Sequence, residues 1–145
     1  MPTIEESIAI KRPIEKVFLY TLDIKSWPKW FTSVSNTERT SQGQFGVGTT
    51  VTAIGKGMGM KVKMIGKVTG YEPNKTWSKE FGTRNTIYNI RYSFDSIEGG
   101  TKVTQQFDIK LSGFMKLFSS TFANSTRKRM KVALNNLKNI LEAQA

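Results

Sequence analysis

The strongest constraint on the fold is a change in the spacing of apolar residues along the chain. From Val34 to Leu111, short runs of alternating apolar and polar residues are separated by Gly, Pro, Asn and Asp, a pattern typical of strands joined by turns. No connection between these runs is long enough for a parallel crossover, so the predicted sheet is antiparallel. Apolar residues then recur every three or four positions, which predicts a long helix over roughly residues 119–143. Its apolar stripe comprises Phe118, Phe122, Met130, Ala133, Leu134, Leu137, Ile140 and Leu141.

The first thirty residues predict one further strand and two short helices. Residues 3–10 alternate with the period of a half-buried strand. Pro13 cannot donate to a ladder but suits the first turn of a helix, which should run to about Leu22. Ser26 can cap a second short helix with Pro28 in its opening turn. The chain is therefore predicted to be one α+β domain over 1–145, with seven strands, two short helices after the first strand and a long C-terminal helix.

Composition excludes several kinds of chemistry. The 145 residues include no His and no Cys, which rules out imidazole ligands, a Ser-His-Asp triad, a His base and thiol nucleophiles. The Asp and Glu residues are scattered, so no metal site and no cofactor is expected. The sequence shows no signal-peptide pattern and no run of about 18 apolar residues, so we expect a cytoplasmic location.

The chain is strongly basic, with 22 Lys and Arg against 11 Asp and Glu and a net charge of +11. Nearly all of the excess lies in residues 56–145. Such a field would attract nucleic acid, anionic membrane or acidic partners, or could serve solubility alone. Lys61, Lys63 and Lys67 share one face of a strand, but no aromatic residue is interleaved with them, which argues against nucleic acid as a partner.

Strand parity directs three polar residues towards the interior. Glu6 stands between Ile4 and Ile8, Lys79 between Trp77 and Phe81, and Gln105 between Val103 and Phe107. Burying a polar group without a partner costs about 1–3 kcal/mol. The three could pair with one another, lie at a solvent-exposed end of the sheet, or show that the assigned strand parity is wrong. Alternatively, they could line a cavity and orient a ligand. In the last case Lys79 would suit a carboxylate or phosphate.

Two aromatic segments have alternative interpretations. Trp27 and Trp30 on the second short helix could stack on a ligand, although packing in the core is the simpler interpretation. The apolar run 114–118, interrupted only by Lys116, could press into an anionic membrane near the basic residues 127–131. The simpler interpretation is that this run docks the start of the helix into a cavity mouth.

Five short segments, in order, resemble one known superfamily. They are IAIKRPIEKVF at 8–18, DIKSWPKW at 23–30, VGT at 47–49, YEP at 71–73 and GGTKVT at 99–104. Together with the terminal helix they resemble the START-like superfamily (SRPBCC), which includes Bet v 1 allergens and polyketide cyclase/dehydrase and lipid-transport proteins. The resemblance covers essentially the whole chain. Glu6 departs from it, because family members usually carry an apolar residue there.

The resemblance implies a helix-grip fold, in which a curved sheet grips the C-terminal helix around an elongated apolar cavity. The mouth of that cavity would lie between the terminal helix, the turn at 55–59 and the loops near 82–85 and 112–115. Glu6, Lys79 and Gln105 would orient a ligand. The cavity walls would be formed by Val62, Met64, Tyr88, Tyr92, Phe107, Phe122, Met130 and Leu134.

The leading functional hypothesis is binding or transport of a small hydrophobic ligand, which could be lipid-, sterol- or polyketide-like and could carry an acid group. A second is a polyketide cyclase or dehydratase in which a tyrosine or Glu6 moves a proton. A third is an interaction or membrane-accessory module that uses the basic surface. No paired carboxylates or activated nucleophile can be inferred from the spacing, so enzymatic activity stays open. We expect a monomer or a weak dimer.

Overall fold

The chain folds in the order that its apolar spacing predicts. The computed structural model describes residues 3–57, 60–83 and 86–144, apart from the side chains at 56, 57, 60, 114, 115 and 119. The elements are β1 (Thr3–Ile10), α1 (Ile14–Leu22), η1 (Ile24–Ser26), α2 (Trp27–Trp30), β2 (Val34–Arg39), β3 (Thr50–Gly57), β4 (Met60–Glu72), β5 (Thr76–Gly82), β6 (Thr86–Ile97), β7 (Gly100–Leu111), η2 (Gly113–Phe118) and α3 (Ser119–Ala143).

The strands form one antiparallel sheet in the order β1-β7-β6-β5-β4-β3-β2. From β2 to β7 each strand pairs with the next one in the sequence, as short turns require. The short helices carry the chain from β1 at one edge to β2 at the other. The predicted α+β class, strand number and strand direction are thus confirmed.

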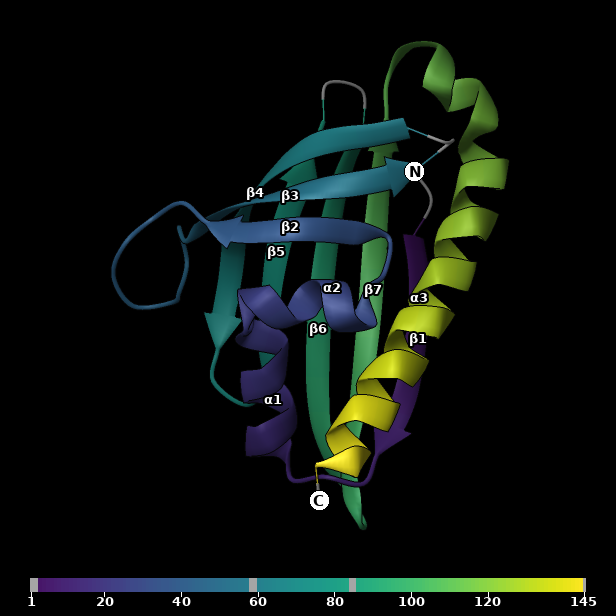
Figure 1. Ribbon diagram of the computed structural model, residues 1–145. Coiled ribbons are helices and arrows are strands. Elements are labelled where there is room, and N and C mark those ends of the chain that lie inside the picture. Colours follow the sequence, from purple (N-terminus) through teal and green to yellow (C-terminus); the bar gives the residue numbers. More distant parts are fainter. Residues whose placement is uncertain (1–2, 58–59, 84–85, 145) are drawn as a thin grey trace.

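Bulges bend the sheet towards its helices. The register shifts between Ser35 and Glu38 in β2 and between Val68 and Gly70 in β4, and Asn36 in the first bulge has a φ of 49°. An extra residue in one strand bends it and increases the local twist. Figure 1 shows β2, β3 and β4 turning away from the direction of β6 and β7, with all the labelled helices on one face of the sheet. The curved half of the sheet therefore faces α2.

The long helix α3 lies along β1 and touches α2 (Figure 1). Its residues Met130, Ala133, Leu134, Leu137 and Leu141 are buried, which confirms that part of the predicted stripe. The Asn136 side chain donates to the carbonyl oxygen of Trp30, and this bond ties α3 to α2. No helix in the described part of the chain is long and apolar enough to cross a membrane.

The prediction was wrong about Phe118 at the start of the stripe. Phe118 ends η2, before α3 begins, and it is half exposed. Together with Leu117, which is 83% exposed, it leaves apolar surface beside Lys116. Phe114 and Met115, also part of the suggested membrane segment, have side chains outside the described set. Contact with a membrane stays a prediction.

Candidate ligand-binding site

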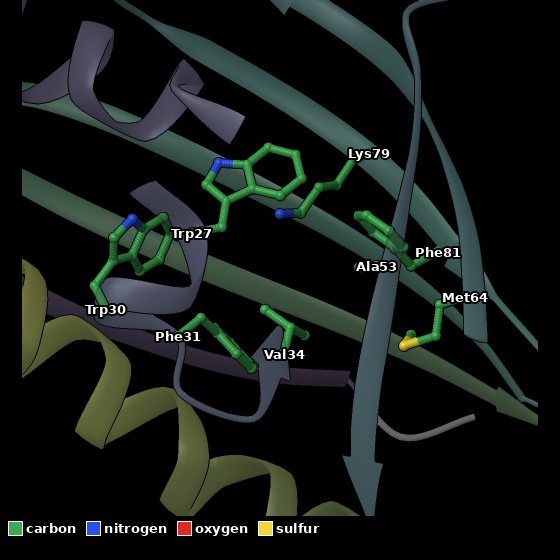
Figure 2. Close-up of a pocket in the computed structure, with 8 residues that line it drawn as sticks. All are labelled: Trp27, Trp30, Phe31, Val34, Ala53, Met64, Lys79 and Phe81. Carbon is green, nitrogen blue, oxygen red and sulfur yellow. The ribbon is translucent and has the colours of Figure 1, made fainter. Parts of the chain in front are cut away.

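A small pocket lies between α2 and the curved half of the sheet, and we call it the α2 pocket. The space open to the centre of a water molecule measures about 50 Å³. The first and last residues of α2, the residue after it and strands β2 to β5 contribute its walls, and Figure 2 shows their side chains. The lining residues are Trp27, Trp30, Phe31, Val34, Ala53, Met64, Lys79 and Phe81. The walls are therefore apolar except for a single amine.

Local hydrogen bonds fix the two indoles of α2. Ser26 donates its hydroxyl to the carbonyl oxygen of Asp23 at 2.6 Å and accepts from Trp30 Nε1 at 3.2 Å. Trp27 Nε1 donates to the carbonyl oxygen of Thr21 at 2.8 Å. Both indole N–H groups are thus satisfied within the same helical segment, and the apolar ring surfaces remain to face the pocket.

Lys79 supplies the amine of the α2 pocket. It lies on β5 between Trp77 and Phe81, and strand parity points it inwards, where only 6% of the residue is exposed. Its Nζ lies 3.6 Å from the centroid of the Trp27 ring, the arrangement visible in Figure 2. The rings of Trp77, Phe81 and Tyr92 follow at 5.1, 5.3 and 5.4 Å. Among the described residues, nothing forms a hydrogen bond or ion pair with this nitrogen.

This environment changes the proton affinity of Lys79. Burial lowers the pKa of its ammonium group from 10.5 to about 7. The face of Trp27 favours the charged form but replaces only part of the lost hydration. None of the other lining residues carries a titratable group. Tyr92 is the nearby titratable side chain, and burial raises the pKa of its phenol, so it stays neutral near pH 7.

Trp77 lies between two other aromatic rings near Lys79 and contacts both of them. Its ring stacks on Tyr92 with centroids 4.8 Å apart and on Trp27 with centroids 5.9 Å apart. Its Nε1 donates to the Thr21 hydroxyl at 3.0 Å, joining β5 to α1. Trp77 is completely buried. The three rings therefore form a rigid stack that joins the sheet to the short helices.

The three inward polar residues do not pair with one another as one interpretation expected. Glu6 lies 3.6 Å from Arg127 and 3.5 Å from Lys131 of α3, so its carboxylate turns to the helix and not to Lys79. Gln105 is the cross-strand neighbour of both Glu6 and Tyr92, and its Nε2 donates to the Tyr92 hydroxyl at 3.1 Å. Within the described residues the Gln105 Oε1 atom is buried without a hydrogen-bond partner.

The residues predicted to line a cavity separate into distinct groups. Met64 and Lys79 line the α2 pocket. Tyr92 does not line it, but its ring centroid lies 5.4 Å from Lys79 Nζ. Val62 is 39% exposed. The others lie on α3 or on strands β6 and β7, where Tyr88 contacts Phe107 and Phe122 with ring centroids 6.2 and 6.1 Å apart. In the same region Phe107, Met130 and Leu134 are buried.

The α2 pocket differs from the cavity that the resemblance implied. No α3 residue with a described side chain lines it, and neither do the described parts of the loops at 82–83 and 112–113. Residues 58–59 and 84–85 of the expected mouth lie outside the described residues. Sequence reasoning singled out Trp27 and Trp30 but favoured the core for them. It had no signal for four other residues, because they come from separate elements: Phe31, Val34, Ala53 and Phe81.

The position of Phe81 in the wall of the α2 pocket depends on Gly66 in β4, the strand that pairs with β5. Gly66 in β4 pairs directly with Phe81, and a Cβ at Gly66 would lie 2.7–2.8 Å from three carbons of the Phe81 ring. We expect Gly66→Ala to displace this ring and lower the free energy of unfolding by about 1–3 kcal/mol. Urea unfolding measures this loss. Gly82→Ala is the matched control, because its new Cβ would lie 3.6 Å from the carbonyl oxygen of Thr86, which is an ordinary contact distance. If Gly82→Ala lowered the free energy of unfolding as much as Gly66→Ala, a clash with the Phe81 ring would not be the cause.

Comparison with known proteins gives a consistent result for the fold. The protein TTHA0849 from Thermus thermophilus has a TM-score of 0.84 and 17% identity, with 99% of each chain covered. Zhui aromatase/cyclase from Streptomyces sp. R1128 has a TM-score of 0.78 and 11% identity, covering 97% of this chain and 93% of that one. Ara h 8.0201 has a TM-score of 0.74 and 16% identity, with 98% of each chain covered. At these identities the likeness establishes the fold alone, which is the Bet v 1-like helix-grip fold.

The sequence itself adds a family assignment. No curated protein matches it. Residues 1–142 match the family described as polyketide cyclase/dehydrase and lipid transport. Family and fold together suggest hydrophobic-ligand binding or a polyketide cyclase/aromatase-type function. Since the match extends over almost the entire sequence, and the predicted helix-grip fold is confirmed, the chain belongs to the polyketide cyclase/dehydrase and lipid-transport family.

Proposed function

We propose that this protein binds a small hydrophobic ligand in the α2 pocket and that Lys79 orients the polar group of that ligand. One observation carries the proposal: Lys79 is buried, its amine faces an apolar pocket, and this amine has no hydrogen-bond or ion-pair partner among the described residues. Burying an amine is unfavourable unless something compensates it. A carboxylate, phosphate or carbonyl oxygen on a ligand would supply the missing partner.

The remaining walls suit the apolar part of such a ligand. Flat surfaces of Trp27 and Phe81 stand on either side of the amine, and Met64 and Val34 lie further out (Figure 2). Ligand sites in proteins commonly combine apolar walls with a few polar groups that fix orientation. The arrangement therefore favours a flat or slender apolar molecule with one oxygen-bearing end.

Size limits what fits without rearrangement. At about 50 Å³, the α2 pocket is roughly a third of the ~150 Å³ of an engineered cavity that binds benzene. Met64 and Val34 are only partly buried, and the unbranched thioether chain of Met64 adapts readily. We propose that these two side chains move aside when a ring enters.

Benzoate is the first probe, because it joins one ring to one carboxylate. All three tryptophans border the α2 pocket or its Lys79, so their fluorescence should report occupation. We expect saturable binding that weakens at least about tenfold in Ala53→Leu, since the larger side chain fills the space of a buried wall residue.

The matched control is Ala9→Leu, which makes the same change at an exposed position of β1. Circular dichroism checks that both variants are folded. If both variants bound benzoate with equal affinity, the binding site would not be the α2 pocket. Native mass spectrometry of gently purified protein provides a second test, and consistently empty protein that no apolar acid stabilises would count against the proposal.

A cyclase-type activity is the second candidate, favoured by the family description and by Tyr88. Burial raises the pKa of the Tyr88 phenol even though Arg129 lowers it, so the phenol keeps its proton near pH 7. A neutral phenol can donate a proton to a reacting carbonyl. Turnover of a polyketide-like substrate that survives both Tyr88→Phe and Glu6→Gln would contradict this role.

A further inference from the structure

Among the described residues that line the α2 pocket, Lys79 is the one whose side chain offers a nucleophilic nitrogen. The indole nitrogens of Trp27 and Trp30 donate their hydrogens within the α1–α2 segment, and an indole nitrogen is no nucleophile. The other lining side chains are hydrocarbon apart from the thioether of Met64. An amine enclosed by aromatic faces, with no acid beside it, has the surroundings that activate a lysine for covalent chemistry.

We propose that Lys79 forms a reversible imine with an apolar aldehyde that enters the α2 pocket. This inference rests on the proposed function, because it concerns the same pocket and names the polar group of the ligand. It goes further by making the contact covalent.

The reaction balances without any additional reagent. The lone pair of Nζ attacks the carbonyl carbon, and the carbonyl π electrons move to oxygen. One of the two Nζ protons then passes to that oxygen through solvent, which gives the carbinolamine. The nitrogen then loses its remaining proton and the carbon loses hydroxide, which leave together as one water molecule. The product is a C=N bond to Nζ, and added water reverses the sequence.

The reaction needs the neutral amine, and the pocket supplies it. Burial brings the pKa of Lys79 to about 7, so roughly half of the molecules carry a neutral amine at pH 7. An exposed lysine with an ordinary pKa near 10.4 is neutral in only about one molecule in 2,500. Selectivity for Lys79 among the lysines of the chain follows from this difference.

The surroundings also favour the product. A protonated imine would lie against the face of Trp27, 3.6 Å from the present position of Nζ, where a delocalised cation is attracted. No lining residue carries a carboxylate, and the phenol of Tyr92, the nearby titratable group, is engaged by Gln105. Among the described residues that line the α2 pocket, no general base is available to deprotonate the imine adduct further, so the imine is the end point.

Reductive trapping tests the inference at pH 7. The protein is incubated with benzaldehyde or with the smaller propanal in the presence of cyanoborohydride, and the adduct is counted by intact mass and located by peptide mapping. We expect one added group on Lys79, formed at least about tenfold faster than on any exposed lysine. Lys79→Arg and Lys79→Met should both lose this fast labelling.

Lys75→Met is the matched control, because Lys75 is largely exposed at the turn before the same strand. In Lys75→Met, the rate of labelling at Lys79 should equal the rate in the protein with the original sequence. Labelling spread over exposed lysines and unchanged in Lys79→Met would overturn the inference, and so would the absence of a Lys79 adduct with both aldehydes.

Benzoate and benzyl alcohol separate the two proposals, since neither can form an imine. Benzoate or benzyl alcohol binding without any aldehyde adduct would leave the proposed function standing and remove the covalent step. Loss of both binding and labelling would remove both proposals.

Discussion

Lys79→Met will stabilise the protein near pH 6, and this gain will shrink as the pH rises. Burial lowers the pKa of Lys79 from 10.5 to about 7, so keeping the ammonium form inside the fold costs about 5 kcal/mol, at about 1.4 kcal/mol per pKa unit. Methionine has a similar shape and carries no charge, so it removes this penalty. Urea unfolding at several pH values measures the effect.

The sign of the pH dependence follows from the protons bound in each state. Below about pH 7 both the folded and the unfolded lysine are protonated, and the penalty is complete. Between that pH and the ordinary lysine pKa near 10.4, the unfolded chain binds more protons, so the stability of the unmodified protein rises with pH. The advantage of Lys79→Met should therefore fall by about 3 kcal/mol between pH 6 and pH 9.

Lys75→Met provides the comparison, because its lysine is exposed and its substitution should shift stability by the same small amount at both pH values. A constant difference between Lys79→Met and the unmodified protein from pH 6 to pH 9 would show that Lys79 has an ordinary pKa. The imine proposal would then lose its source of neutral amine.

Trp77→Ala will destabilise the fold by about 3–5 kcal/mol, the usual range for removing a buried large aromatic residue. Trp77 is completely buried between Trp27 and Tyr92 and also donates to the hydroxyl of Thr21. Its loss would leave a cavity and free the rings that face Lys79. Urea unfolding followed by circular dichroism measures the change without relying on the removed fluorophore.

Trp77→Phe separates the loss of the hydrogen bond from the loss of the ring, and Ile65→Ala is the control for an exposed position of the same sheet. Phenylalanine keeps a ring in the stack but cannot donate to Thr21, so we expect an intermediate loss. Ile65 lies in the same sheet and is largely exposed, so Ile65→Ala should change stability by only about 0.5 kcal/mol. A Trp77→Ala loss no greater than that of Ile65→Ala would show that the aromatic stack does not hold the short helices to the sheet.

The family assignment suggests a hydrophobic ligand or a cyclase-type reaction, and it leaves the reacting group open. In this chain an amine stands among four aromatic rings, in a pocket bounded by α2 and strands β2 to β5. Tests of ligand class should therefore begin with molecules that an amine can recognise or bind covalently.

Strand parity alone predicted which polar side chains of the sheet are buried. It placed Lys79 and Gln105 in the interior, and both are buried. It also directed Glu6 inwards, yet that carboxylate turns to Arg127 and Lys131 on α3. Parity states which face of a strand a residue occupies, and the partner depends on which element covers that face.

The sequence by itself determined the antiparallel sheet, the element order and the long helix, because each of these depends on local spacing of apolar residues and on short connections. Only the tertiary structure decided where a pocket lies and what surrounds Lys79. Trp27 and Lys79 are distant in the sequence, and they meet because bulges in β2 and β4 bend the sheet towards α2. Curvature of that kind is set by packing across the whole sheet, which no local pattern encodes.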